Sequence, residues 1–192
     1  QIDKILKVVN HNFEFIDFGG GMGINYKKSD QKLSYSKLSD SVKKFIKNRN
    51  IKIIFEPGRS IVGNSAILLT KIIYIKNSKN RNFIIFDAAM NDLMRPALYG
   101  SYHNIIPLKK NKKKIKKIHC FVGPVCETTD QFLTTKNYYK INEGDILGIC
   151  DVGAYGMVLS SNYNLRTKPP EIMINKSNFR SISSRQNLKD II

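Results

Sequence analysis

The sequence predicts a chain of mixed class, α/β in its first third and β-rich afterwards. Two apolar runs in the first third, FEFIDF at 13–18 and IKIIFE at 51–56, have the composition of buried strands. Between them, apolar residues recur at helical spacing, namely Leu38, Val42, Phe45 and Ile46. A strand, a helix and a second strand in this order indicate a parallel pair with a crossover, and such a pair needs further units to cover it.

From Ala66 onward, short apolar runs alternate with polar or glycine-containing turns: AILLTKIIYI, NFIIFDA, HNIIPL, HCFVGP and DILGIC. These runs predict the strands of a β-rich domain. We expect short helices at 90–98 and 154–161, and a last strand at 171–174 after two prolines. The tail from Asn175 is polar, and we expect it to be frayed.

We assign the formal charge of +17 to a solvated surface and not to a nucleic-acid partner. Only seven of the 32 basic residues are arginine, and the chain is also crowded with Ile and Asn, which is the bias of an AT-rich genome. The most basic run, KKNKKKIKK at 109–117, has no aromatic residues between its lysines and is expected to be an exposed loop. Nucleic-acid binding is therefore a distant alternative.

Neither a metal site nor a membrane span is predicted. Cys120, Cys126 and Cys150 lack the spacing of a zinc site, and their odd number argues against a disulfide framework. We therefore expect the protein to reside in the reducing cytoplasm. The longest apolar stretches are interrupted by Lys71 and are much shorter than a bilayer is thick. Two of the cysteines, Cys120 and Cys150, have apolar neighbours and are expected in the core.

Two turns at the ends of the predicted parallel strands carry residues suited to an anion. DFGGGMG places the glycines 19–21 directly after the first strand, where their backbone N–H groups can converge. The second strand ends in EPGR, which brings Glu56 and Arg59 to the same edge. In (β/α)8 barrels the loops after the last two strands often form a phosphate site. A tight glycine turn and a simple pairing of Glu56 with Arg59 are the alternatives.

These two turns occur together with three further segments, MNDLMRPALYGSYH at 90–103, GPVCETTD at 123–130 and DVGAYG at 151–156. In this order and spacing they resemble the diaminopimelate decarboxylase family, within the alanine-racemase-like group of pyridoxal-phosphate-dependent decarboxylases. The resemblance covers roughly Phe13 to Ile174. RPALYGSYH and the order Cys-Glu are similar to the diaminopimelate branch, whereas ornithine decarboxylases generally carry Cys-Asp.

The resemblance implies the fold and the extent of the chain. Residues 1–62 would be the last two strands and helices of a (β/α)8 barrel that binds pyridoxal phosphate, residues 63–176 a β-rich C-terminal domain of barrel or sandwich type, and residues 177–192 a polar tail. The lysine that links the cofactor in this family lies upstream, and no lysine here has its context. We therefore expect a C-terminal fragment that is inactive alone.

The resemblance also implies roles for individual residues. The cofactor contacts would be Gly19, Gly20, Gly21, Glu56, Pro57, Gly58, Arg59 and Tyr155, with Glu56 facing the pyridine nitrogen. The substrate contacts would be Arg59, Arg95, Tyr99, Glu127 and Tyr155. Cys126 would be the acid that returns a proton to carbon. Without the resemblance, Arg95 and Tyr99 would be a surface pair and Cys126 a core residue; His103 and His119 are expected to be structural, and His11 to lie on the surface.

The function implied is the decarboxylation of meso-diaminopimelate to L-lysine, the last step of lysine synthesis, with pyridoxal phosphate as the cofactor. The resemblance further implies a homodimer whose active site lies between the subunits. Two alternatives stay open: a decarboxylase acting on ornithine, arginine or carboxynorspermidine, and a catalytically inactive homologue that binds a partner.

Overall fold

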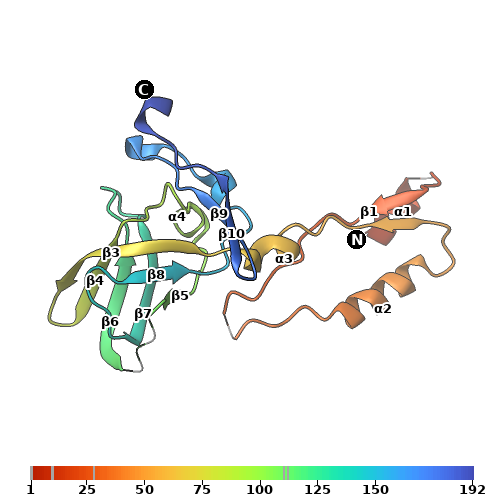
Figure 1. Ribbon diagram of the computed structural model, residues 1–192. Coiled ribbons are helices and arrows are strands. Elements are labelled where there is room, and N and C mark those ends of the chain that lie inside the picture. The colour runs from red at the N-terminus through yellow and green to blue at the C-terminus, as the bar shows by residue number, and fades with distance from the viewer. Residues whose placement is uncertain (1, 10, 28, 110, 112) are drawn as a thin grey trace.

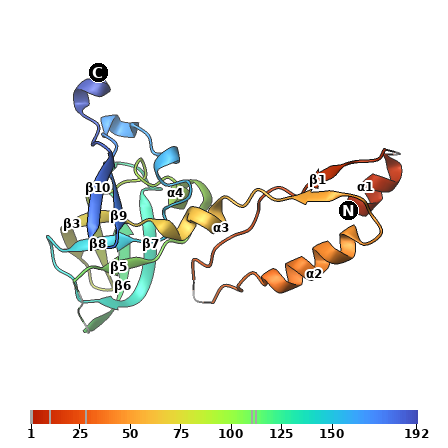
Figure 2. The ribbon, with the colours of Figure 1, turned by 45° about the vertical axis from the view of Figure 1, so that its right-hand side comes forward.

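The computed structural model describes residues 2–9, 11–27, 29–109, 111 and 113–192. It consists of an extended N-terminal arm, residues 2–58, and a sheet domain, residues 63–192, which the short helix α3 (Arg59–Val62) connects (Figure 1). Figure 2 shows that the arm projects away from the sheet domain in a second view as well. The loop after β1 returns along the arm to the sheet domain before α2 begins.

The arm contains the elements α1 (Ile2–Val8), β1 (Phe15–Asp17), α2 (Tyr35–Ile46) and β2 (Lys52–Ile54). The strands β1 and β2 pair in parallel, with Ile16 opposite Ile53, which confirms the predicted crossover unit. Helix α2 begins where it does because the Ser34 side chain caps it, accepting a hydrogen bond from the backbone N–H of Lys37.

Apolar side chains of the arm remain open to solvent. Among the described residues up to Val62, none is buried. Phe15 of β1 is 57% exposed and Ile54 of β2 is 41% exposed. Parallel strands are normally covered on both faces, so this pair lacks the cover that such strands usually have.

The sheet domain is built on six strands in the order β5-β8-β3-β4-β6-β7. Their bounds are β3 (Leu68–Asn77), β4 (Arg81–Phe86), β5 (Ile105–Pro107), β6 (Lys114–Val122), β7 (Gln131–Tyr139) and β8 (Ile146–Ile149). All neighbours pair antiparallel except β4 and β6. The curved sheet encloses a core whose most buried members are Phe86, Phe121, Leu147, Ile149, Ile72 and Ile84. This core confirms the β-rich prediction and gives the site loops a rigid base.

Strand β7 and the C-terminal hairpin differ from the sequence predictions. No strand was predicted at 131–139, although QFLTTKNYY supplies the buried residues Phe132 and Tyr138. The strands β9 (Glu171–Asn175) and β10 (Asn178–Ser183) pair antiparallel. The expectation of a frayed tail is therefore wrong for β10, because backbone pairing with β9 orders a polar strand that has little apolar content.

Three further local predictions need correction. Residues 154–161 contain only a 3-10 turn, Met157–Leu159, because the left-handed backbone of Tyr155 (φ 61°) interrupts any helix there. The helix α4 (Arg95–Tyr99) is confirmed but begins after the predicted start at 90. In the basic run, Lys114–Lys117 belong to β6 and not to a loop, while positions 110 and 112 lie outside the described residues. No helix in the described ranges is long and apolar enough to cross a membrane.

Candidate functional site

The glycine loop after β1 lies against the turn that follows β2. The backbone N–H of Glu56 donates to the carbonyl of Gly19 at 2.9 Å. A Cβ atom at Gly20 would stand 2.6 Å from the Glu56 carbonyl oxygen, so only glycine allows this approach. Gly19 and Gly21 have φ of +67° and +82°, and the space that their Cβ atoms would face is open. The loop is therefore a close-fitting backbone cradle with room for a ligand.

Arg59, the first residue of α3, lies beside the end of this cradle. Its Nη2 is 3.8 Å from the position of a Cβ at Gly23. Within the described part of the chain, Arg59 makes no ion pair with Glu56, which is exposed. The alternative in which these two residues merely pair is thus not supported. Both charges remain available to a ligand.

The loop that carries Tyr155 packs on the helix that carries Arg59. The N–H of Gly153 donates to the carbonyl of Gly63 at 3.1 Å. A Cβ at Gly153 would stand 1.9 Å from the Val62 carbonyl oxygen, so this contact requires glycine. Tyr155 follows with a half-exposed side chain. The glycine loop, the EPGR turn and the DVGAYG loop thus meet around α3.

Arg95 is buried where the arm meets the sheet domain. It is 5% exposed, and its Nη1 donates to the Tyr26 hydroxyl at 2.7 Å and lies 3.2 Å from Nε2 of His103. No acidic side chain pairs with it among the described residues. Tyr99, one turn further along α4, is 66% exposed. The two do not form the surface pair that the sequence alone suggested, because Arg95 is turned inward.

A buried guanidinium without an anionic partner is unusual. Removing such a cation from water is costly unless it is paired, so buried charges are normally paired or bound to a ligand. The Nε and Nη2 atoms of Arg95 have no hydrogen-bond partner among the described residues, and they are not fully enclosed, so a ligand can reach them. Arg95 is therefore prepared to receive an anion such as a carboxylate, which matches its planar donors.

The Cys126–Glu127 loop joins β6 to β7. Both side chains are exposed, and the Glu127 carboxylate accepts a hydrogen bond from the Tyr163 hydroxyl at 3.2 Å. This bond to the carboxylate raises the pKa of the Tyr163 hydroxyl. Within the described residues, no hydrogen bond joins the loop to the glycine cradle or to Arg95. The cradle, Arg59 and the loop that carries Tyr155 thus meet at α3, whereas no hydrogen bond in the described chain links Cys126 or Glu127 to them.

Buried Asp130 folds this loop. Its two carboxylate oxygens accept the backbone N–H groups of Met90 at 2.7 Å and Val125 at 2.9 Å. A Cβ at Gly123 would stand 2.3 Å from the carboxylate, so glycine is needed there too. Burial raises the pKa of the Asp130 carboxyl, although the two N–H donors oppose the shift. Asp130 therefore ties the Cys126 loop to the segment that leads to α4.

Replacing Asp130 by alanine is expected to loosen the Cys126 loop, because two buried N–H groups lose their acceptor, each at about 1–3 kcal/mol. Alkylation of Cys126 by iodoacetamide, followed by mass spectrometry of the full-length gene product, should become faster, and amide exchange at 123–130 should increase. Buried Cys120 is the internal reference, because it should stay unreactive. Unchanged exchange at 123–130 would contradict this role.

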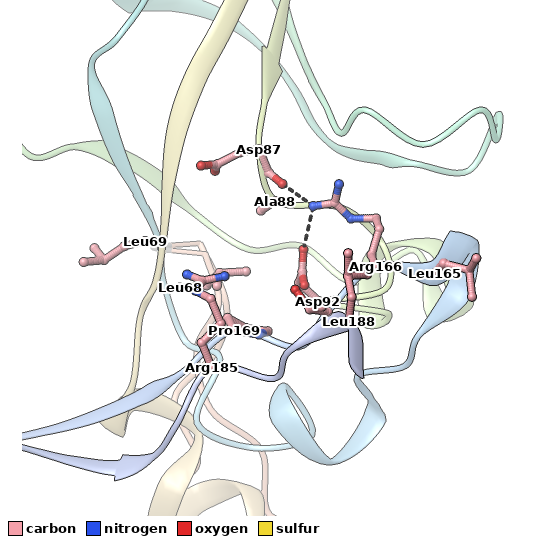
Figure 3. A pocket seen from close by; sticks show the side chains of 11 residues that line it. Leu68, Leu69, Asp87, Ala88, Asp92, Leu165, Arg166, Pro169, Arg185 and Leu188 are labelled. Carbon is pink, nitrogen blue, oxygen red and sulfur yellow. Dashed lines mark hydrogen bonds and ion pairs between the residues drawn. The ribbon is translucent and has the colours of Figure 1, made fainter. Parts of the chain in front are cut away.

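A separate cavity of about 400 Å³ lies beside β3, and Figure 3 shows Arg166 at its wall. Arg166 donates from Nη2 to the carbonyl of Asp87 at 2.5 Å and from Nε to Asn91 Oδ1 at 2.8 Å, and lies 3.6 Å from the Asp92 carboxylate. Burial raises the pKa of Asp92, while Arg166 lowers it. None of the site residues predicted from sequence lines this cavity. Arg166 instead fixes residues 87–92, which precede Arg95 in the chain.

Sequence reasoning missed three residues that shape these loops, namely Tyr26, Asp130 and Arg166, and it gave His103 only a structural role. Asp130 and His103 stand inside the quoted segments CETTD and YGSYH, so their motifs were a usable signal. Tyr26 and Arg166 have no motif, and only the fold reveals their contacts. Cys120, His103 and His119 are buried and His11 is exposed, as expected, whereas Cys150 is only partly buried.

Comparisons with known proteins agree with this arrangement. Residues 8–153 match the family model of the pyridoxal-dependent decarboxylase C-terminal sheet domain. The chain is 39% identical to a diaminopimelate decarboxylase of Aquifex aeolicus over 94% of its own length and 43% of that protein. A diaminopimelate decarboxylase from Neisseria meningitidis serogroup A is 42% identical, over 92% of this chain and 43% of that protein.

A solved structure gives the same result in three dimensions. The crystal structure of diaminopimelate decarboxylase from Helicobacter pylori complexed with L-lysine superposes with a TM-score of 0.86 and 35% identity, over 99% of this chain and 46% of that one. The chain therefore spans less than half the length of the proteins it matches. Because the family model covers most of the chain, the protein belongs to the pyridoxal-dependent decarboxylases and contains their C-terminal sheet domain.

Proposed function

We propose that the full-length gene product decarboxylates meso-diaminopimelate to L-lysine, the last step of lysine synthesis, with pyridoxal phosphate as cofactor. The observation that carries this proposal is the buried guanidinium of Arg95, which has no acidic partner among the described residues. A substrate with a second carboxylate, distant from the reacting one, supplies that partner. Relatives named diaminopimelate decarboxylase add support.

The cofactor fits the residues around α3. In this proposal the N–H groups of Gly20 and Gly21 and the Arg59 guanidinium hold the phosphate, together with the Tyr155 hydroxyl. Gly19 shapes the loop, because its own N–H donates to the Asp17 carboxylate at 2.7 Å. The support is the open space beside Gly19 and Gly21, the close approach of Gly20 to Glu56, and the absence of an ion pair to Arg59 within the described chain. The turn Pro57–Gly58 separates Arg59 from Glu56, which faces the pyridine nitrogen.

The substrate is held at its distal end by a cation and an anion together. Arg95, Tyr99 and Arg59 bind the distal carboxylate, and Glu127 binds the distal amine. Tyr155 contacts the substrate as well as the cofactor. Ornithine has a distal amine but no distal carboxylate, so it would leave Arg95 without an anion. The enzyme is therefore expected to prefer diaminopimelate.

Bound pyridoxal phosphate supplies the electron sink that lets the carbon–carboxylate bond break. The carboxylate leaves as carbon dioxide, and the electron pair of the broken bond stays on the α-carbon. Cys126 donates its Sγ proton to this carbon, and the thiolate regains a proton from solvent. Glu127 and Arg95 hold the other end of the substrate meanwhile, so that only one of the two α-carbons is presented.

We further propose that residues 1–62 complete a (β/α)8 barrel with upstream strands, that residues 63–176 form its C-terminal β domain, and that the cytoplasmic enzyme is a homodimer. Exposed Phe15 and Ile54 support the barrel, since additional parallel strands would cover them. Among the described residues no hydrogen bond joins the Cys126–Glu127 loop to the glycine cradle, which supports a site shared between subunits.

Complementation tests the shared site. The Cys126→Ala and Glu56→Gln variants should each be nearly inactive. Mixing their subunits should restore roughly a quarter of the wild-type sites, because half of the dimers are then mixed and each mixed dimer contains one intact site of two. Activity is measured after co-expression of both full-length chains. Mixed samples that stay inactive, although native mass spectrometry shows mixed dimers, would place both residues in one subunit's site.

Substrate competition tests the assignment itself. The purified full-length product with pyridoxal phosphate is given equal amounts of meso-diaminopimelate and ornithine, and lysine and putrescine are quantified. Lysine should dominate. An excess of putrescine would transfer the assignment to another diamino-acid decarboxylase. A preparation that binds no cofactor, judged by the absence of a visible absorbance band that borohydride abolishes, would favour an inactive homologue.

A further inference from the structure

We infer that His103 is a positioning residue, which holds the Arg95 guanidinium in the geometry that receives the distal carboxylate. His103 is fully buried, and its Nε2 lies 3.2 Å from Nη1 of Arg95. Its other ring nitrogen, Nδ1, lies 2.9 Å from the carbonyl oxygen of Cys150. The imidazole therefore connects the end of β8 with α4. This inference rests on the proposed substrate role of Arg95.

The two neighbours of the ring determine its tautomer. A carbonyl oxygen only accepts hydrogen bonds, so Nδ1 must carry the proton that faces Cys150. In a neutral ring Nε2 is then a lone-pair acceptor, and it can accept the N–H of Arg95. Nη1 also donates to the Tyr26 hydroxyl at 2.7 Å, so both of its protons have acceptors. Nε and Nη2 of the guanidinium stay available for a carboxylate.

The buried environment of the ring favours this neutral state. Burial is the main cause that lowers the pKa of His103 from its ordinary value of 6.5, and the Arg95 charge lowers it further. The Cys150 carbonyl and Asp151 oppose this shift. Tyr26 faces the ring edge-on, with centroids 5.4 Å apart. A second proton on the ring would place an N–H donor against the Arg95 donor and add a like charge. Acidification should therefore displace Arg95.

The experiment measures carboxylate recognition separately from turnover. L-lysine keeps the distal carboxylate of diaminopimelate, whereas cadaverine has none. The Kd of cadaverine divided by the Kd of lysine is called the ratio below. It reports the carboxylate contact, because the two ligands have the same amines. Titration calorimetry on the full-length holoenzyme gives both Kd values from about pH 8 down to well below the ordinary histidine pKa, because the pKa of His103 is lowered.

Two variants separate the acceptor from the ring. His103→Phe keeps a planar ring but offers no acceptor, and should lower the ratio roughly ten-fold or more, with KM for diaminopimelate raised and kcat nearly unchanged. His103→Gln places an amide oxygen near the position of Nε2 and cannot titrate. It should restore most of the ratio and abolish its fall at low pH. The matched control is His119→Phe, another buried histidine, on β6, which contacts none of the proposed site residues.

The outcomes distinguish this inference from the proposed function. If the wild type neither turns over diaminopimelate nor prefers lysine to cadaverine, the proposed function fails. If the wild type does both but His103→Phe keeps its ratio, only the role of His103 is overturned. A ratio that rises on acidification would also overturn it, because His103 would then be a direct cationic contact. If His103→Phe does not fold, His103→Gln still tests the role of His103. A Kd ratio that does not change with pH in His103→Gln supports that role, and a Kd ratio that falls on acidification as it does in the wild type contradicts it.

Discussion

Replacing Cys126 by alanine is expected to lower kcat for diaminopimelate by about 100-fold to 10,000-fold, the range that a positioned general acid contributes. The thiol is exposed on the β6–β7 loop and forms no disulfide within the described residues. The change removes the proton donor but leaves Arg95 and Glu127 in place. KM should therefore change little, and initial-rate kinetics on the full-length enzyme separates the two constants.

The matched control is Cys150→Ala. Cys150 is partly buried, and burial raises the pKa of its thiol, so it is a poor proton donor. The substitution keeps the backbone carbonyl that faces His103. It should leave kcat near the wild-type value. A Cys126→Ala enzyme that keeps kcat within a few-fold of wild type would exclude the thiol as the proton donor.

Replacing Arg95 by glutamine is expected to raise KM for diaminopimelate by about 100-fold or more, with a smaller change in kcat. Loss of one partner from a buried ion pair typically costs about 3–5 kcal/mol, because the other charge is left without its partner. The amide retains one donor near Tyr26 and His103, so the fold should tolerate the change. Arg81→Gln, at an exposed position on β4, is the control and should keep the wild-type KM. A wild-type KM in Arg95→Gln would contradict the carboxylate contact.

Local signals in the sequence predicted much of the fold. The strand, helix and strand of the arm were found because their hydrophobic periods are distinct, and β3, β4, β6 and β8 because their apolar runs end at polar or glycine turns. Strand β7 was missed because polar Thr134 and Thr135 interrupt its apolar pattern. Strand β10 was missed because its side chains are mostly exposed, so its pairing with β9 leaves little hydrophobic trace.

The position of the glycine loop beside the EPGR turn could be predicted, because both turns follow neighbouring parallel strands. The contact between Gly20 and Glu56 follows from two glycine-containing turns at the ends of neighbouring strands. The environment of Arg95 could not be predicted, because its partner Tyr26 is 69 residues away and belongs to a loop without regular structure. The tautomer of His103 likewise depends on Cys150, at the end of β8. Such long-range contacts have no local sequence pattern.

The most direct test of the central claim is the stoichiometry of the reaction. The full-length product, saturated with pyridoxal phosphate, is incubated with meso-diaminopimelate, and L-lysine and carbon dioxide are quantified together. The account predicts one lysine and one carbon dioxide for each diaminopimelate consumed, and a marked loss of both in Cys126→Ala. A holoenzyme that binds the cofactor but releases neither product from diaminopimelate would contradict it.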